Sequence, residues 1–66
     1  MISLNSNVIK GVEYINGQLD ILFFDGSLMR YFGVPENVYT YLLSSTIAYD
    51  YYDAVIKHEY HSIKIR

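Results

Sequence analysis

The side chains best suited to binding chemistry lie mostly in the last third of the sequence. Residues 57–66 interleave cations with an aromatic ring, an arrangement that can hold a phosphate while a base stacks on the ring. Tyrosines add rings with a polar tip, and one arginine of the first half adds a cation. The candidate binding residues are Arg30, Tyr49, Tyr51, Lys57, His58, Tyr60, Lys64 and Arg66. An ordinary solubilising terminus is the alternative explanation for the basic tail.

Charge is distributed unevenly along the chain, whose formal net charge is −2. Residues 1–56 hold two bases against six acids, whereas residues 57–66 hold three bases against one acid. Proteins that bind nucleic acid through counterion release carry a basic patch and an excess of bases. The balance therefore argues against general nucleic-acid binding, and leaves room for a local contact by the C-terminal segment.

No constellation typical of catalysis or metal binding is visible. The chain has no cysteine, which excludes thiolate chemistry and zinc–thiolate sites. His58 and His61 lack a third ligand at suitable spacing. Glu13 and Asp20 are expected on adjacent strands, where a solvated surface explains them. The sequence predicts a non-enzymatic protein with no metal and no other cofactor.

The length of 66 residues limits what can position these side chains. It predicts a single domain over residues 1–66. Hydrophobic residues make up 52% and charged residues 18%, which is more apolar than so small a surface readily hides. A homo-oligomer or a standing protein partner is therefore expected. The absence of cysteines, of a long apolar run and of a signal-peptide pattern indicates a cytoplasmic protein without membrane contact.

The first half predicts an antiparallel meander of three strands. Asn16-Gly17 and Asp25-Gly26 are dipeptides that two-residue hairpin turns prefer, because both central residues need positive φ. Three runs rich in β-branched and aromatic residues surround them, at residues 7–15, 18–24 and 27–32.

Alternation along these strands predicts two apolar faces. One face needs a cover of helices, and it takes Val12, Tyr14, Leu19, Ile21, Phe23, Met29 and Tyr31. The other face is unusually apolar for a solvated surface. A second layer or a subunit contact is expected to cover it, and the predicted interface residues are Leu22, Phe24, Leu28 and Phe32.

The second half predicts two short helices. Pro35 suits the first turn of a helix that continues to the Ser44-Ser45-Thr46 cluster. Apolar residues at steps of three and four predict another helix within residues 48–60. Ile63 and Ile65 then alternate with basic residues. The expected fold is α+β, a three-stranded antiparallel β-meander covered on one face by two short helices, with an optional C-terminal strand.

Six of the eight tyrosines fall into two groups by position. Tyr14, Tyr31 and Tyr52 fall on apolar stripes and are expected in the core. The second group lies off the apolar stripe of its helices and is expected at the surface, in a cluster that favours an interface. That group is Tyr41, Tyr49 and Tyr51.

The central motif resembles that of a known family. Residues 31–35, Tyr-Phe-Gly-Val-Pro, followed by Val38-Tyr39 and Leu42, resemble the centre of the KTSC domain. That family is named after its place at the C-terminus of some lysyl-tRNA synthetases, and it also occurs as free-standing small bacterial proteins. The resemblance runs over nearly the whole chain, through Ile9, Val12, Tyr14, Leu19, Ile21, Phe23, Gly26, Tyr51-Tyr52-Asp53, Ile56 and Tyr60.

The resemblance implies RNA binding. In the family, this function is inferred from the proteins in which the domain occurs. Three departures weaken that implication here. Met29 replaces the first tyrosine of the central Tyr-x-Tyr, Tyr49-Asp50 replaces a Gly-Lys, and Ala54 replaces a basic residue. The last two departures remove positive charge from a segment that would face a polyanion.

Three functions remain as alternatives. The first is a small homo-oligomeric binding module that contacts a protein partner or a phosphate-bearing ligand such as a nucleotide. The second is an RNA-binding domain that uses tyrosine stacking and the basic tail. The third is a phage-type inhibitor or a protein that sequesters a small ligand.

Overall fold

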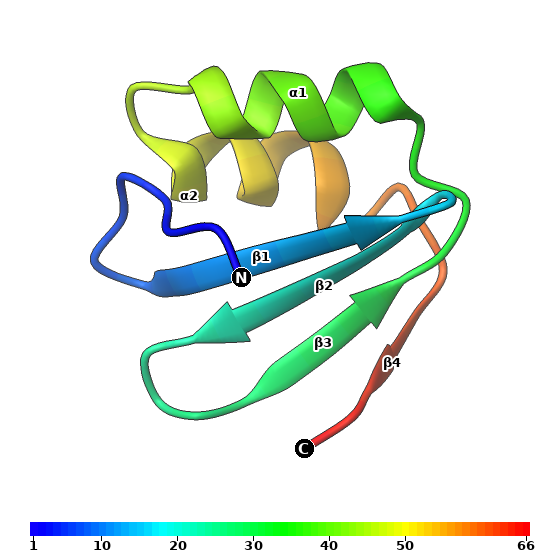
Figure 1. Cartoon of the computed structure of the whole chain (residues 1–66), viewed down its shortest axis with the longest axis horizontal. Helices are drawn as coiled ribbons and strands as arrows, with labels where there is room; N and C mark the ends of the chain where they lie inside the picture. The colour runs from blue at the N-terminus through cyan, green and yellow to red at the C-terminus, as the bar shows by residue number, and fades with distance from the viewer.

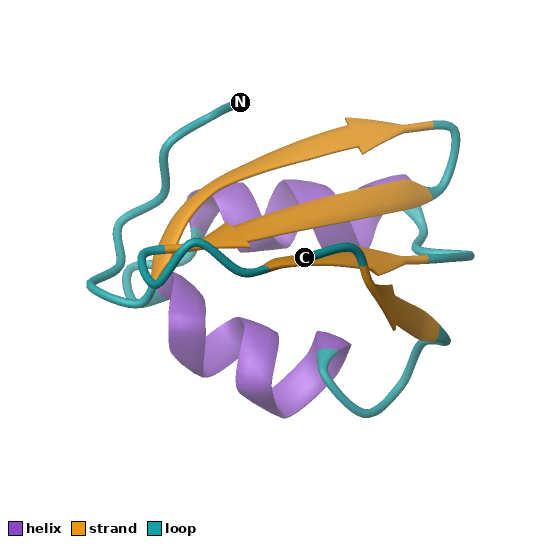
Figure 2. Ribbon diagram, turned by 90° about the horizontal axis from the view of Figure 1, so that it is seen from below, coloured by secondary structure: helices purple, strands orange, loops and turns teal.

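The computed structural model describes residues 1–66, and its four strands form one antiparallel sheet in the order β1-β2-β3-β4. Both helices lie on one face of this sheet (Figures 1 and 2). The predicted α+β fold is confirmed, and the optional C-terminal strand is present. The elements are β1 (Ile9–Ile15), β2 (Gln18–Phe23), β3 (Leu28–Tyr31), α1 (Glu36–Ser44), α2 (Ala48–Tyr51), η1 (Tyr52–Ile56) and β4 (Ser62–Lys64).

The turn between β1 and β2 has the predicted two-residue form. Ile15 pairs with Gln18, and the two residues between them, Asn16 and Gly17, have φ angles of 48° and 83°. Asn and Gly tolerate this left-handed backbone better than other residues. The Asn-Gly signal thus sets the register of the first hairpin.

The turn between β2 and β3 differs from the prediction. Leu22 pairs with Leu28, and the loop closes through the Phe23 amide, which donates to the Ser27 carbonyl at 2.9 Å. Three residues, 24–26, therefore form the loop, and only Gly26 has positive φ, at 91°. A two-residue loop would shift the register by one and turn the inward side chains of β3 outward.

The core lies between the sheet and the helices. Ten hydrophobic residues pack together there, and each of them is at most 4% exposed. They are Ile9, Val12, Leu19, Ile21, Tyr31, Val34, Leu42, Ala48, Tyr52 and Ile56. The expectation that Tyr31 and Tyr52 are core residues is confirmed, and Tyr14 packs partly buried against the same cluster.

The main chain of Val34 joins the sheet to the helical layer. Its amide donates to the Gly17 carbonyl at 2.9 Å, and its carbonyl accepts from the Tyr14 hydroxyl at 2.6 Å. Tyr14 also stacks on Tyr39 of α1, with ring centroids 4.6 Å apart. These contacts fix where α1 begins relative to the first hairpin.

The second helix is shorter than the predicted 48–60 and changes its winding. After the single α-helical turn of α2, the chain forms one π-helical turn, η1, in which the Lys57 amide donates to the Tyr52 carbonyl at 2.9 Å. Tyr52 and Ile56 both reach the core from this turn. Turns of this kind occur often at functional sites.

None of the helices has the length and apolar character that a membrane span needs.

The face of the sheet opposite the helices is named the open face here. Leu22 and Leu28 are half-buried on it, and Phe32 is 37% exposed. None of these three belongs to the side chains packed on the core. The chain itself places no helix there (Figure 2), so the expected subunit contact stays a prediction.

Candidate functional site

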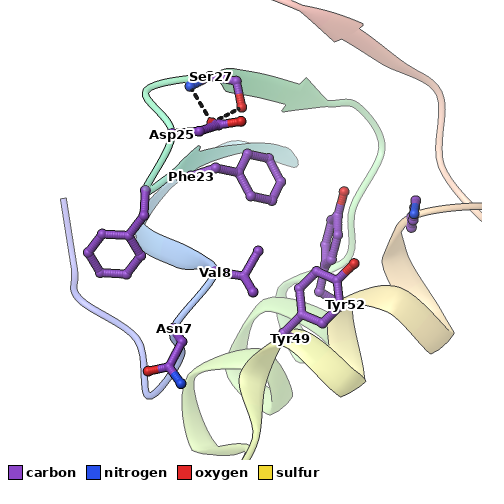
Figure 3. Close-up of a pocket in the computed structure, with 9 residues that line it drawn as sticks. Asn7, Val8, Phe23, Asp25, Ser27, Tyr49 and Tyr52 are labelled. Carbon is purple, nitrogen blue, oxygen red and sulfur yellow. Dashed lines mark hydrogen bonds between the residues drawn. The ribbon is translucent and has the colours of Figure 1, made fainter.

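A hollow of about 460 Å³ lies where the β2–β3 loop, the segment before β1 and the second helix meet. Its volume falls within the range of roughly 300–1,000 Å³ that is usual for small-molecule sites. Figure 3 shows aromatic rings on both of its sides, from β2 and from the helix. The lining residues are Asn7, Val8, Phe23, Phe24, Asp25, Ser27, Tyr49, Tyr52 and Lys57.

The aromatic wall of the hollow is held in place by Tyr52. Its ring lies 5.8 Å from the rings of both Phe23 and Tyr49. Its hydroxyl shares a 2.6 Å hydrogen bond with the hydroxyl of Tyr31. Burial, and then this bond, raise the pKa of the Tyr52 phenol far above 10, so this phenol stays neutral.

The rim of the hollow is polar and carries both signs of charge. Lys57 is the one cation among the lining residues, and its ammonium lies 3.5 Å from the Asp53 carboxylate. Asp25 accepts hydrogen bonds from the Ser27 hydroxyl at 2.6 Å and the Ser27 amide at 2.9 Å. Both bonds lower the pKa of the Asp25 carboxyl, because they favour its ionised form.

Of the predicted binding residues, the structure brings Tyr49 and Lys57 to this hollow, together with Phe24 from the predicted interface set. Tyr41 is 62% exposed, as expected. Tyr49 and Tyr51 are half-buried instead of exposed, because both pack against the core. Burial also raises the pKa of Tyr51.

Arg30 lies away from the hollow, on the open face. Its Nε and Nη2 donate to the two carboxylate oxygens of Asp20 at 2.9 and 3.0 Å. Hydrogen bonding to Asp20 raises the pKa of Arg30 further, so it stays charged. The guanidinium is thus paired within the chain and is not a free cation for phosphate.

The basic tail does not form one surface with Arg30. Lys64 pairs with Met29 in the sheet register, whereas Arg30 pairs with Ile63, so Lys64 and Arg30 point to opposite faces. Tyr60 packs partly buried against the core. The remaining tail residues of the prediction, His58 and Arg66, are exposed.

Sequence reasoning missed most of the hollow. Asn7, Val8, Phe23, Asp25 and Ser27 come from two segments that only the fold brings to the second helix. The Asp25-Gly26 turn was the one available signal, since it places a carboxylate at a strand end. No group of three or more His, Asp or Glu side chains lies close enough to hold a metal ion.

Comparison with known proteins identifies the family. The sequence matches the KTSC domain over residues 5–60. The fold is similar to the crystal structure of a KTSC domain protein from Yersinia pestis, with a TM-score of 0.85 and 31% identity, over 92% of this chain and 89% of that one. No curated protein sequence matches. The predicted resemblance is confirmed, and the chain belongs to the KTSC domain family.

Proposed function

We propose that this protein is a small non-enzymatic binding module, and that the hollow takes a planar ring carrying an anionic group. A nucleotide is the simplest ligand of this kind. The observation that carries the proposal is that four of the nine lining residues are aromatic and one is a lysine at the rim.

The ring would bind between side chains from two elements. Phe23 belongs to β2 and Tyr49 to α2, so a planar group entering the hollow meets aromatic surface on both sides (Figure 3). Base–aromatic stacking contributes about 1–3 kcal/mol per base. Because the Tyr31–Tyr52 hydrogen bond and the rings around Tyr52 fix this wall, little side-chain entropy remains to be lost on binding.

The anionic group would bind at Lys57. Its contact with the Asp53 carboxylate is a single exposed pair at 3.5 Å, unlike the bidentate, part-buried Arg30–Asp20 pair, so a ligand anion can replace Asp53 at little cost. Asp25 on the far side of the rim keeps a negative charge, which repels an anion and offers an acceptor to ring N–H groups. A ligand with N–H donors at one end and a phosphate at the other matches both rim charges.

The experiment is a titration of the isotopically labelled protein with nucleoside monophosphates and the matching nucleosides, followed by amide NMR at constant ionic strength. We expect shifts at residues lining the hollow. Tyr49→Ala should weaken every ligand by about 5- to 150-fold. Lys57→Ala should weaken the nucleotides and leave the nucleosides unchanged.

Matched controls lie outside the hollow. Tyr41→Ala removes an exposed tyrosine of α1, and Lys10→Ala an exposed lysine of β1; neither should change affinity. Shifts confined to Lys64 and Arg66, with single-stranded RNA binding that falls steeply with salt, would favour the RNA-binding alternative. No shifts with any nucleotide at millimolar concentration would overturn the proposal.

A further inference from the structure

The open face continues across all four strands. Leu22 of β2 lies opposite Leu28 of β3. Ile63 of β4 and Ile65 just beyond it extend the apolar surface and are 44% and 40% exposed. Phe32 completes it beside His61, with ring centroids 5.9 Å apart. Several large apolar side chains thus meet solvent on one side of a very small protein, which is typical of an interaction surface.

One ion pair lies within this apolar surface. Asp20 is only 6% exposed although no helix covers it, because the Arg30 guanidinium lies across it through two hydrogen bonds. The Arg30 side chain keeps 33% of its own surface exposed. Bidentate arginine–carboxylate pairs are geometrically specific, and arginine is enriched in interface cores.

The strand order makes the two central strands of this face complementary to those of a second copy. Asp20 and Arg30 are register partners on the two central strands, as are Leu22 and Leu28. If two copies stack about a two-fold axis parallel to the strands, β2 of one lies over β3 of the other. Asp20 then faces the Arg30 of the second copy, and Arg30 faces its Asp20. Opposite charges meet in both directions, and each leucine meets a leucine. At the margins, the exposed Glu13 of β1, which is in register with Asp20, lies over Ile63 of the second copy.

The size of the face suits a dimer. A standard interface buries about 800 Å² on each partner. That is about one fifth of the 4130 Å² surface of this chain, and the molecule measures 26 × 25 × 20 Å. The open face, toward the viewer in Figure 2, spans the longest and the shortest of these extents, so the dimer would bury most of this side. We propose that a second copy of this chain covers the open face, in a symmetric face-to-face dimer.

The test is sedimentation velocity on the wild-type chain over a concentration series, beside the variants Leu28→Glu and Ile63→Glu. The wild type should be dimeric at micromolar concentration. Each glutamate should raise the dimer dissociation constant by about 100-fold or more. Leu28→Glu would set a charge against a leucine, and Ile63→Glu would set a carboxylate against Glu13 of the second copy. Circular dichroism reports whether each variant is folded. Ile63→Glu, at an exposed position of an edge strand, serves if Leu28→Glu fails to fold.

The matched control is Leu43→Glu on α1, since Leu43 is 38% exposed on the helical side and should leave the dimer intact. A wild type that remains monomeric at millimolar concentration overturns the proposal and leaves the face to a different partner. A dimer that dissociates with Leu43→Glu and persists with folded Ile63→Glu also overturns it. The dimer test is independent of ligand binding, because the hollow lies on the helical side, around the Tyr52 wall.

Discussion

Both faces of the sheet carry apolar side chains, but only one has a helical layer over it. On the helical face, Ile21 is fully buried and Tyr31 is 2% exposed. On the open face, the neighbouring residue Leu22 is only half-buried and Phe32 is 37% exposed. Similar residue types therefore stabilise the chain on one face and remain available to a second molecule on the other.

The sharpest comparison uses adjacent residues of one strand. Ile21→Ala should lower the free energy of unfolding by about 2–5 kcal/mol, because it leaves a cavity in the core. Leu22→Ala should cost about 1 kcal/mol at low protein concentration, because its side chain has fewer partners. Urea denaturation measures both. Equal losses at low concentration would contradict the distinction between the faces, and a Leu22→Ala loss that grows with concentration would support the dimer.

The next largest effect concerns the paired hydroxyls of the helical face. Tyr52→Phe should cost about 1–2 kcal/mol, because it leaves the hydroxyl of Tyr31 without its buried partner. The Tyr31→Phe/Tyr52→Phe double variant should cost less than the sum of the two single variants. Tyr41→Phe, at an exposed ring, is the control and should be neutral. If the two losses simply add, the hydroxyls of Tyr31 and Tyr52 do not stabilise each other.

The third comparison is between an ion pair on the open face and one on the helical side. Arg30→Met should lower the urea midpoint, because it uncovers and unpairs the nearly buried Asp20 carboxylate. Lys57→Met breaks an exposed pair, with side chains 44% and 50% exposed, and should change the midpoint little. A larger shift for Lys57→Met would mean that the Asp20–Arg30 pair contributes no more than a surface contact.

The smallest expected effect concerns Asp25 in the β2–β3 loop, and it depends on pH. The folded-state pKa of Asp25 is lowered from 3.8. Its stabilising contribution is therefore present above pH 3.8 and is lost as pH falls through the folded-state value. The stability difference between wild type and Asp25→Asn should shrink with acidification below pH 3.8. A difference that does not change over that range would contradict the role of the Ser27 hydrogen bonds.

The sequence predicts the fold well where local patterns decide it. Asn16-Gly17 carries its own backbone preference, so the first hairpin follows directly from the dipeptide. Asp25-Gly26 was misleading as a turn signal, because alternation in the flanking strands outweighs it. Placing Met29 and Tyr31 on the face of Ile21 requires the three-residue loop. The alternation was therefore the better guide to this register.

The candidate site was harder to predict because its parts are distant in sequence. The residue types of Tyr49 and Lys57 point to binding, yet their partner Phe23 carries only the pattern of a core residue. The sequence predicts Arg30 as a binding residue, but the strand register places it opposite Asp20. The π-helical turn that brings Tyr52 to the hollow has no signature in the residue pattern.

The late position of β4 in the chain has a kinetic consequence. The first three strands pair with their neighbours in sequence, and such hairpins form in about 1–10 μs. Pairing of Tyr31 with Ser62 must instead close a loop that contains both helices, so it bears a larger entropic cost. The three-residue β4 should join the sheet last and leave it first. In native-state hydrogen exchange, its amides should open through local fluctuations, while those of β1 and β2 require unfolding of the whole molecule.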